Sequence, residues 1–197
     1  MSREPLAEFL PWTPLASFAA TRWLQAHDLP ADVDRLAEAF YGQPGPFGLE
    51  HGSMELVLGA ALVLPVGDNL FEVDDAGRRA ALQPVEDAGG AVVDIIAWHP
   101  GNPDRWRFLT GEGEALGLIE LELLPEEETI ICYSSPLSWL RAGGRGLCLL
   151  ASDWAVVQRV LIGERQVGFE TRELATWIER CLRHRPMPKL FVLDQAA

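Results

Sequence analysis

Lysine is almost absent from this chain of 197 residues, in which Lys189 is the single lysine among 16 basic residues. Such a bias towards arginine, together with abundant alanine, glycine and proline, is typical of a GC-rich bacterial genome or of its mobile elements. It also removes most of the chemistry that depends on lysine. Lys189 is the single candidate for a Schiff base, and its place just before an apolar run is a poor one for that role.

Cysteine pairs are also missing, because Cys132, Cys148 and Cys181 form no CxxC motif and leave an odd thiol. Each of them lies in an apolar run, which predicts buried, reduced cysteines. The histidines are scattered, and none pairs with another or with a carboxylate at a spacing typical of metal ligands. They are His27, His51, His99 and His184. The sequence therefore predicts no metal and no cofactor.

No apolar run approaches the ~18 residues that a membrane-spanning helix needs, since the longest, residues 56–66, is about half that length and contains a glycine and a proline. The first residues, 1–5, show no basic segment followed by an apolar one, so we predict no secretory signal. We therefore expect a cytoplasmic protein that does not enter a membrane.

The formal net charge of −13 argues against a nucleic-acid partner, because affinity for phosphates depends on clustered basic residues. One basic group, Arg180, Arg183, His184 and Arg185, closes a predicted helix, where cations complement the helix dipole. An acidic mimic of nucleic acid would need its negative charges on one face, and the interspersed arginines make that arrangement doubtful.

The apolar share of 48% and the charged share of 23% are those of an ordinary globular protein, and the length suits one compact unit. Residues 1–42 predict a helical hairpin, whose first helix begins at Thr13 and Pro14 and whose second ends at Gly42. The stretch 43–48, rich in proline and glycine, separates this hairpin from an α+β domain over residues 47–197.

Apolar periodicity and turn residues predict the remaining elements. Residues 53–66 fit a buried helix or a strand, and the turn residues that follow favour a strand for the later part. The other predicted strands are 70–73, 92–98, 106–110, 114–124, 129–133, 146–151 and 190–193. Predicted helices cover 136–142, a segment from Ser152 or Asp153 to Ile162, and a segment from the N-cap Thr171 to Pro186.

We predict an α+β fold with an N-terminal helical hairpin, a mostly antiparallel sheet and C-terminal helices packed on one face. An α/β arrangement with some parallel strands is the alternative, because strands and helices alternate after Thr129. Three of the seven tryptophans fall on apolar helix faces and are expected in the core: Trp23, Trp139 and Trp177. The other four, Trp12, Trp98, Trp106 and Trp154, lie at the ends of predicted elements.

The most informative stretch is residues 98–106, in which two prolines, a glycine and an Asn-Pro pair separate two apolar runs. This pattern predicts a long polar loop that reverses the chain, with a tryptophan at each end. Exposed tryptophan and arginine are enriched at interface hot spots, so Trp98, His99, Arg105 and Trp106 are our candidate binding residues. The structural alternative, which we favour, is that the two tryptophans pair across the strands.

The sequence contains only two groups of residues that fit catalysis, and neither matches a known catalytic motif. His99 and Asp104 fit an acid–base couple if the loop brings them together, although such a pair more often fixes a loop. Scattered carboxylates have the chemistry to bind Mg²⁺ for phosphoryl transfer, yet their neighbours are typical of turns and helix caps. These carboxylates are Asp74, Asp75, Asp94, Asp104 and Asp153.

Two further motifs have structural explanations. Ser134 and Ser135 lie where a strand meets a helix, but no GxSxG surrounds them, and Pro136 marks an ordinary helix start with a serine cap. The glycines of residues 143–146 follow a helix and precede a strand, which is the reverse of a phosphate-binding loop. We therefore predict a helix stop and a turn there.

We accordingly expect a non-catalytic binding or accessory protein that acts through protein–protein contacts, because no catalytic motif is present. The alternative is a hydrolase or a metal-dependent phosphotransfer enzyme that uses His99 and dispersed carboxylates. A concave pocket in which His99 and at least two carboxylates converge would favour the enzyme, and a convex aromatic loop would favour binding.

Overall fold

In the computed structural model, the residues that can be described are 18–29, 59–123, 125, 127–151, 153–161 and 166–183. Of the predicted N-terminal hairpin, the helix α2 (Phe18–Gln25) belongs to this part. The second predicted helix, the linker 43–48 and the predicted strand 190–193 lie outside the described residues, as do Trp12 and His51.

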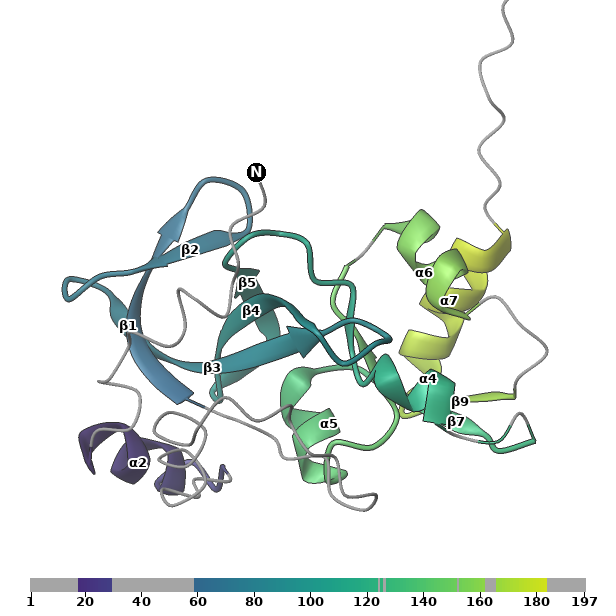
Figure 1. The fold of residues 1–197 in the computed structure, drawn as a ribbon, viewed down its shortest axis with the longest axis horizontal. Helices are drawn as coiled ribbons and strands as arrows, with labels where there is room; N and C mark the ends of the chain where they lie inside the picture. The colour runs from purple at the N-terminus through teal and green to yellow at the C-terminus, as the bar shows by residue number, and fades with distance from the viewer. Residues whose placement is uncertain are drawn as a thin grey trace, which may run out of the picture.

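Five strands form a closed barrel in the order β1-β2-β5-β4-β3 (Figure 1). They are β1 (Gly59–Val66), β2 (Leu70–Val73), β3 (Arg78–Glu86), β4 (Val92–His99) and β5 (Asn102–Phe108). All neighbours pair antiparallel except β2 and β5, which meet in parallel at Leu70 and Phe108 and close the barrel. The strand predicted for the later part of 53–66 is confirmed, whereas barrel closure was not predicted.

Alternation along the strands gives the barrel two apolar faces. One face fills the interior with three alanines, two branched aliphatic side chains and one phenylalanine: Ala61, Phe71, Ala80, Leu82, Ile95 and Ala97. The other face points outward and packs against Leu24 of α2 and against Trp139 of the helix that follows β7. Both faces of β3 and β4 are therefore buried, which explains their nearly continuous apolar sequences.

A second sheet has the order β6-β8-β7-β9. Its strands are β6 (Ala115–Leu116), β7 (Ile130–Tyr133), β8 (Leu147–Leu149) and β9 (Val167–Phe169). Strand β7 pairs in parallel with both β8 and β9, and β6 is antiparallel to β8. The fold thus mixes helices and strands as predicted, and the parallel strands after Thr129 are those of the alternative arrangement.

The helices of this half are α4 (Ile119–Leu123), α5 (Pro136–Arg141), α6 (Trp154–Leu161) and α7 (Arg172–Arg183). The prediction that the C-terminal helices share one face is wrong. Cys148 of β8 packs on the side of α5, whereas its neighbours Leu147 and Leu149 pack on the side of α6 and α7. The chain steps from β7 to β8 and then back past β7 to β9. Because crossovers between parallel strands are right-handed as a rule, two steps in opposite directions put their helices on opposite faces of the sheet.

The strand predicted over 114–124 is also wrong, because β6 ends at Leu116 and the chain then enters α4. Gly117 makes the break, with a positive φ of 80° and a backbone so close to the Gly146 carbonyl oxygen that a Cβ atom would collide with it. Strand β9 was missed, because three residues with a central glycine carry too little alternation.

A buried carboxylate fixes the connection between the barrel and the second sheet. Asp94 of β4 has no exposed surface, and its two oxygens accept hydrogen bonds of 2.8 to 3.1 Å from the backbone N–H groups of residues 109–113. The Ile95 N–H donates a further bond of 2.7 Å. We call residues 109–113 the Asp94 loop. Six N–H donors around one carboxylate compensate its loss of water.

No helix in the described parts of the chain is both long enough and apolar enough to cross a membrane.

Candidate functional site

The tip of the β4–β5 hairpin holds the four residues that the sequence singled out. His99 pairs with Asn102, so the strands are joined by the two residues Pro100 and Gly101, and the long loop that we expected is wrong. The next pair is Trp98 with Trp106, which leaves residues 103–105 as an extra bulge on β5. The prolines and glycine thus shape a tight turn and a bulge.

Trp98 and Trp106 form the cross-strand pair. Trp98 is 2% exposed, and its Nε1 donates to Oε1 of Gln83 at 3.2 Å. Trp106 is half-buried, and its Nε1 donates to the Leu150 carbonyl oxygen at 3.0 Å. Both indoles are therefore held by the core, and they fix the direction in which the hairpin tip points. The binding role predicted for them stays a prediction.

His99, Asp104 and Arg105 are exposed at the tip. The His99 Nδ1 accepts a hydrogen bond of 3.0 Å from the Gly101 N–H. In the described part of the chain, no hydrogen bond or ion pair joins His99 to Asp104. The structure therefore presents His99 and Arg105 to solvent without assembling the acid–base couple that the sequence suggested.

The His99 ring instead contacts two side chains at helix α2, those of Trp23 and His27. Its ring centroid lies 5.8 Å from that of Trp23 and 5.9 Å from that of His27, both edge to face. His27 is also stacked at a tilt on Trp23, with centroids 4.6 Å apart. No sequence signal points to this cluster of Trp23, His27 and His99, because His99 is far from the other two in the chain.

The hydrogen bonds assign complementary roles to the two imidazoles. His27 Nδ1 lies 2.8 Å from the Trp23 carbonyl oxygen, which only accepts, so this nitrogen carries a proton, and in the neutral ring Nε2 has the lone pair. His99 Nδ1 accepts from Gly101, so the neutral ring carries its proton on Nε2. The cluster thus offers one acceptor nitrogen and one donor nitrogen beside an indole ring.

Three of the five carboxylates suggested as magnesium ligands have structural partners. Asp94 is saturated by the Asp94 loop, Asp74 accepts from the Ala76 N–H at 2.7 Å in a turn, and Asp153 accepts from the Ala155 N–H at 2.8 Å at the start of α6. Within the described ranges, no three histidine, cysteine or acidic side chains are grouped closely enough to hold a metal ion. No observation here favours the enzymatic alternative, which stays a prediction.

The serines between β7 and α5 have separate roles. Ser135 is the N-cap of α5, as predicted, and its Oγ accepts from the Ser138 N–H at 3.2 Å. Ser134 donates to Oε2 of Glu170 from both its N–H, at 2.9 Å, and its hydroxyl, at 2.6 Å. Burial alone would raise the pKa of Glu170, but hydrogen bonds from Ser134 and Ser138 outweigh it and hold the pKa below its ordinary value. This pair joins the carboxyl ends of β7 and β9.

The three cysteines are free and buried, as predicted. Burial raises the pKa of the Cys132 thiol to about 12, and it also raises the pKa values of Cys148 and Cys181. Cys132 and Cys148 lie on neighbouring strands but face opposite sides of the sheet. All three therefore behave as core side chains.

Comparison of the chain with protein-family models, with curated proteins and with solved structures gives no match.

Proposed function

We propose that this protein is a binding or accessory protein that recognises a partner protein through the tip of the β4–β5 hairpin. The observation that supports this most is the contrast within the tip. Trp98 and Trp106 are anchored in the core, while His99 and Arg105 beside them are exposed. A polar tip on a fixed hairpin suits recognition.

Preorganisation is the physical reason. A partner that contacts an already ordered tip pays less for immobilising side chains and backbone, so fewer contacts suffice for a given affinity. Arginine is enriched among residues that dominate binding energies, because its guanidinium donates several hydrogen bonds in a fixed geometry. Arg105 is therefore the residue expected to contribute most.

The cluster beside the tip extends the surface and indicates what it would accept. Arg105 suits a carboxylate or a main-chain carbonyl, and the His99 Nε2–H is a second donor. The Nε2 lone pair of His27 suits an N–H donor, and the half-buried Trp23 supplies apolar contact. Backbone amides and acidic side chains of a protein partner offer these groups together.

In the experiment that tests this proposal, the tagged full chain is used to capture partners from a lysate of the source cell, and the captured proteins are identified by mass spectrometry. We expect Arg105→Ala and His99→Ala to lose the captured partner by about tenfold or more, with melting temperatures unchanged. Arg172→Ala is the matched control, because Arg172 is an exposed arginine at the start of α7 in the other half of the molecule. Equal capture by all these variants would refute a role for the tip.

A further inference from the structure

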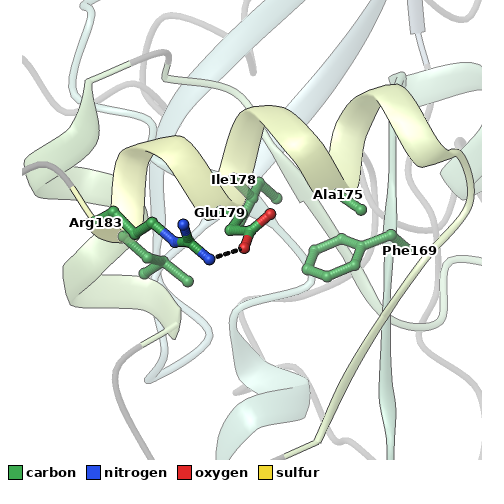
Figure 2. Close-up of a pocket in the computed structure, with 6 residues that line it drawn as sticks. Phe169, Ala175, Ile178, Glu179 and Arg183 are labelled. Atoms are coloured by element: carbon green, nitrogen blue, oxygen red, sulfur yellow. Dashed lines mark hydrogen bonds and ion pairs between the residues drawn. The ribbon is translucent and has the colours of Figure 1, made fainter.

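An apolar groove runs along α7 beside β9 (Figure 2). It has a volume of about 470 Å³, and its lining residues are Phe169, Ala175, Ile178, Glu179, Leu182 and Arg183. Leu182 is 40% exposed, which makes it one of the few large apolar side chains at the surface of the described part. Isolated exposed apolar residues are common, but here they continue into a groove.

The groove lies on a second face of α7. Residues 175, 178, 179, 182 and 183 follow the spacing of one helical face. The first apolar face of α7 contains Leu174, Trp177, Ile178 and Cys181 and packs on the sheet and α6, so the groove borders this face at Ile178. A helix of a parallel sheet normally covers the strand before it and the strand after it. Helix α7 packs against β9 and α6, and among the described residues no strand lies on the far side of β9.

The free edge of β9 is ready to pair. The Gln166 carbonyl and the Glu170 N–H bond to β7, and backbone groups of alternate residues point to opposite sides of a strand. Those of Val167 and Phe169 therefore point away from β7. Among the described residues, no strand pairs with that edge. An uncovered edge of this kind is a template for one more strand.

The chain leaves α7 at Arg183, which is itself a groove residue. Six residues, 184–189, then lead to the run Leu190-Phe191-Val192-Leu193. Connections of ~2 to 6 residues are usual between a helix and the next strand of a parallel sheet. Pro186 and Pro188 fall in this connection, and four apolar residues in a row are typical of a strand buried on both faces.

We propose that Leu190–Leu193 binds in the groove as an additional strand of the second sheet, parallel to β9. Strand β9, α7 and this segment then form a right-handed crossover unit like that of β7, α5 and β8. The backbone of the segment pairs with Val167 and Phe169, and its inward side chains cover Leu182 and the Phe169 ring. The groove is therefore filled by the protein's own chain and is closed to an apolar partner.

Residue-resolved amide hydrogen exchange on the full chain tests this proposal. We expect the Val167 and Phe169 amides, together with two or more amides of 190–193, to exchange at least tenfold more slowly than in an open segment. The Gly168 and Glu170 amides, which face β7, are the internal reference. Fast exchange at Val167, Phe169 and 190–193 in the wild-type chain would overturn the proposal.

Two substitutions locate the contact from both sides. Phe191→Asp and Leu182→Asp should each release the protection of Val167 and Phe169 while the barrel amides stay protected. Gln195→Asp and Thr176→Asp are the matched controls, because each adds the same charge outside the proposed contact; Thr176 is an exposed residue of α7. Protection that depends on protein concentration would mean that a second copy supplies the strand, which also overturns the proposal.

Discussion

Trp106 on β5 donates a hydrogen bond of 3.0 Å to the carbonyl oxygen of Leu150, which follows β8 and lies 44 residues further along the chain. The Leu150 N–H in turn donates to the Glu114 carbonyl oxygen at 2.9 Å, close to β6. This relationship joins the barrel to the second sheet, and it gives the hairpin tryptophan a structural role that its sequence context does not reveal.

Trp106→Phe should lower the free energy of unfolding by ~1 kcal/mol, because the ring packing stays while one hydrogen bond is lost and the Leu150 carbonyl loses its partner. Trp106→Ala should cost about 3 kcal/mol, since the cross-strand packing is lost as well. Urea unfolding measures both. Arg105→Ala is the control and should change stability by less than about 0.5 kcal/mol. A Trp106→Ala protein as stable as the wild type would contradict this account.

Asp94→Asn should be strongly destabilising, by about 3 kcal/mol or more. The substitution removes the charge that accepts six N–H bonds and turns an amide NH₂ group towards the N–H donors of the Asp94 loop. Chemical denaturation checks the value. Asp104→Asn, at an exposed position on the hairpin, should be nearly neutral. Similar stabilities for the two variants would show that the Asp94 loop is held by other contacts.

Gln83 and Trp98 provide a double-mutant cycle. The Gln83 Oε1 accepts from Trp98, while its Nε2 is buried without a partner. Gln83→Met leaves the Trp98 N–H unpaired, and Trp98→Phe leaves the whole Gln83 amide unpaired, so each should cost ~1 to 3 kcal/mol. The double variant buries no orphaned polar group at this pair. The loss of unfolding free energy in the double variant should be smaller than the sum of the losses in the two single variants by about 1 kcal/mol or more. Strict additivity of the two losses would refute the coupling.

The pair Ser134 and Glu170 predicts a dependence on pH. Because hydrogen bonds hold the Glu170 pKa below its ordinary value of 4.5, the stability they add is present above that pH and is lost as the pH falls through the lower pKa of the folded state. Ser134→Ala removes the 2.6 Å bond, so the Glu170 pKa should rise, which NMR titration of its carboxyl carbon detects. The variant should also lose less stability than the wild type as the pH falls from neutrality through the Glu170 pKa of the folded state. An unchanged titration curve would exclude this role.

The thiols should be inert in the folded protein. A rise of the Cys132 pKa from 9.0 to about 12 lowers its thiolate fraction about 1000-fold at neutral pH, and burial blocks the reagent as well. Titration with a thiol reagent should find little reaction in native buffer and three reacting groups after denaturation. Rapid labelling of two or more cysteines in the native protein would show that the sheet opens readily.

Features set by neighbouring residues could be predicted from the sequence. The N-caps Ser135 and Thr171 lie where the pattern places them, and Asp153 is one of the two caps predicted for α6, because a cap depends on a side chain and the next three residues. The first apolar face of α7 was likewise visible in its spacing. Turns with aspartate and glycine were found for the same reason.

Features that depend on distant residues could not be predicted. Barrel closure rests on β2 meeting β5 in parallel, and no local pattern records that pairing. The contact between His27 and His99 likewise joins separate parts of the chain. The Asp94 carboxylate looked like any scattered acidic side chain, because its partners are main-chain N–H groups, which have no sequence signature. The opposite faces of α5 and α7 follow from strand order, which the sequence left open.

The barrel strands succeed one another along the chain without interruption, and this has a consequence for synthesis of the protein. Every residue of the barrel interior precedes residue 110, so the interior can close while the second sheet is still being translated. At that stage α5 is not yet present to cover the outward apolar face around Ile96 and Trp98. The Trp106 N–H also lacks its hydrogen-bond acceptor, the Leu150 carbonyl oxygen. A barrel that closed at that stage would leave an apolar surface uncovered until α5 emerged, and such surfaces promote aggregation.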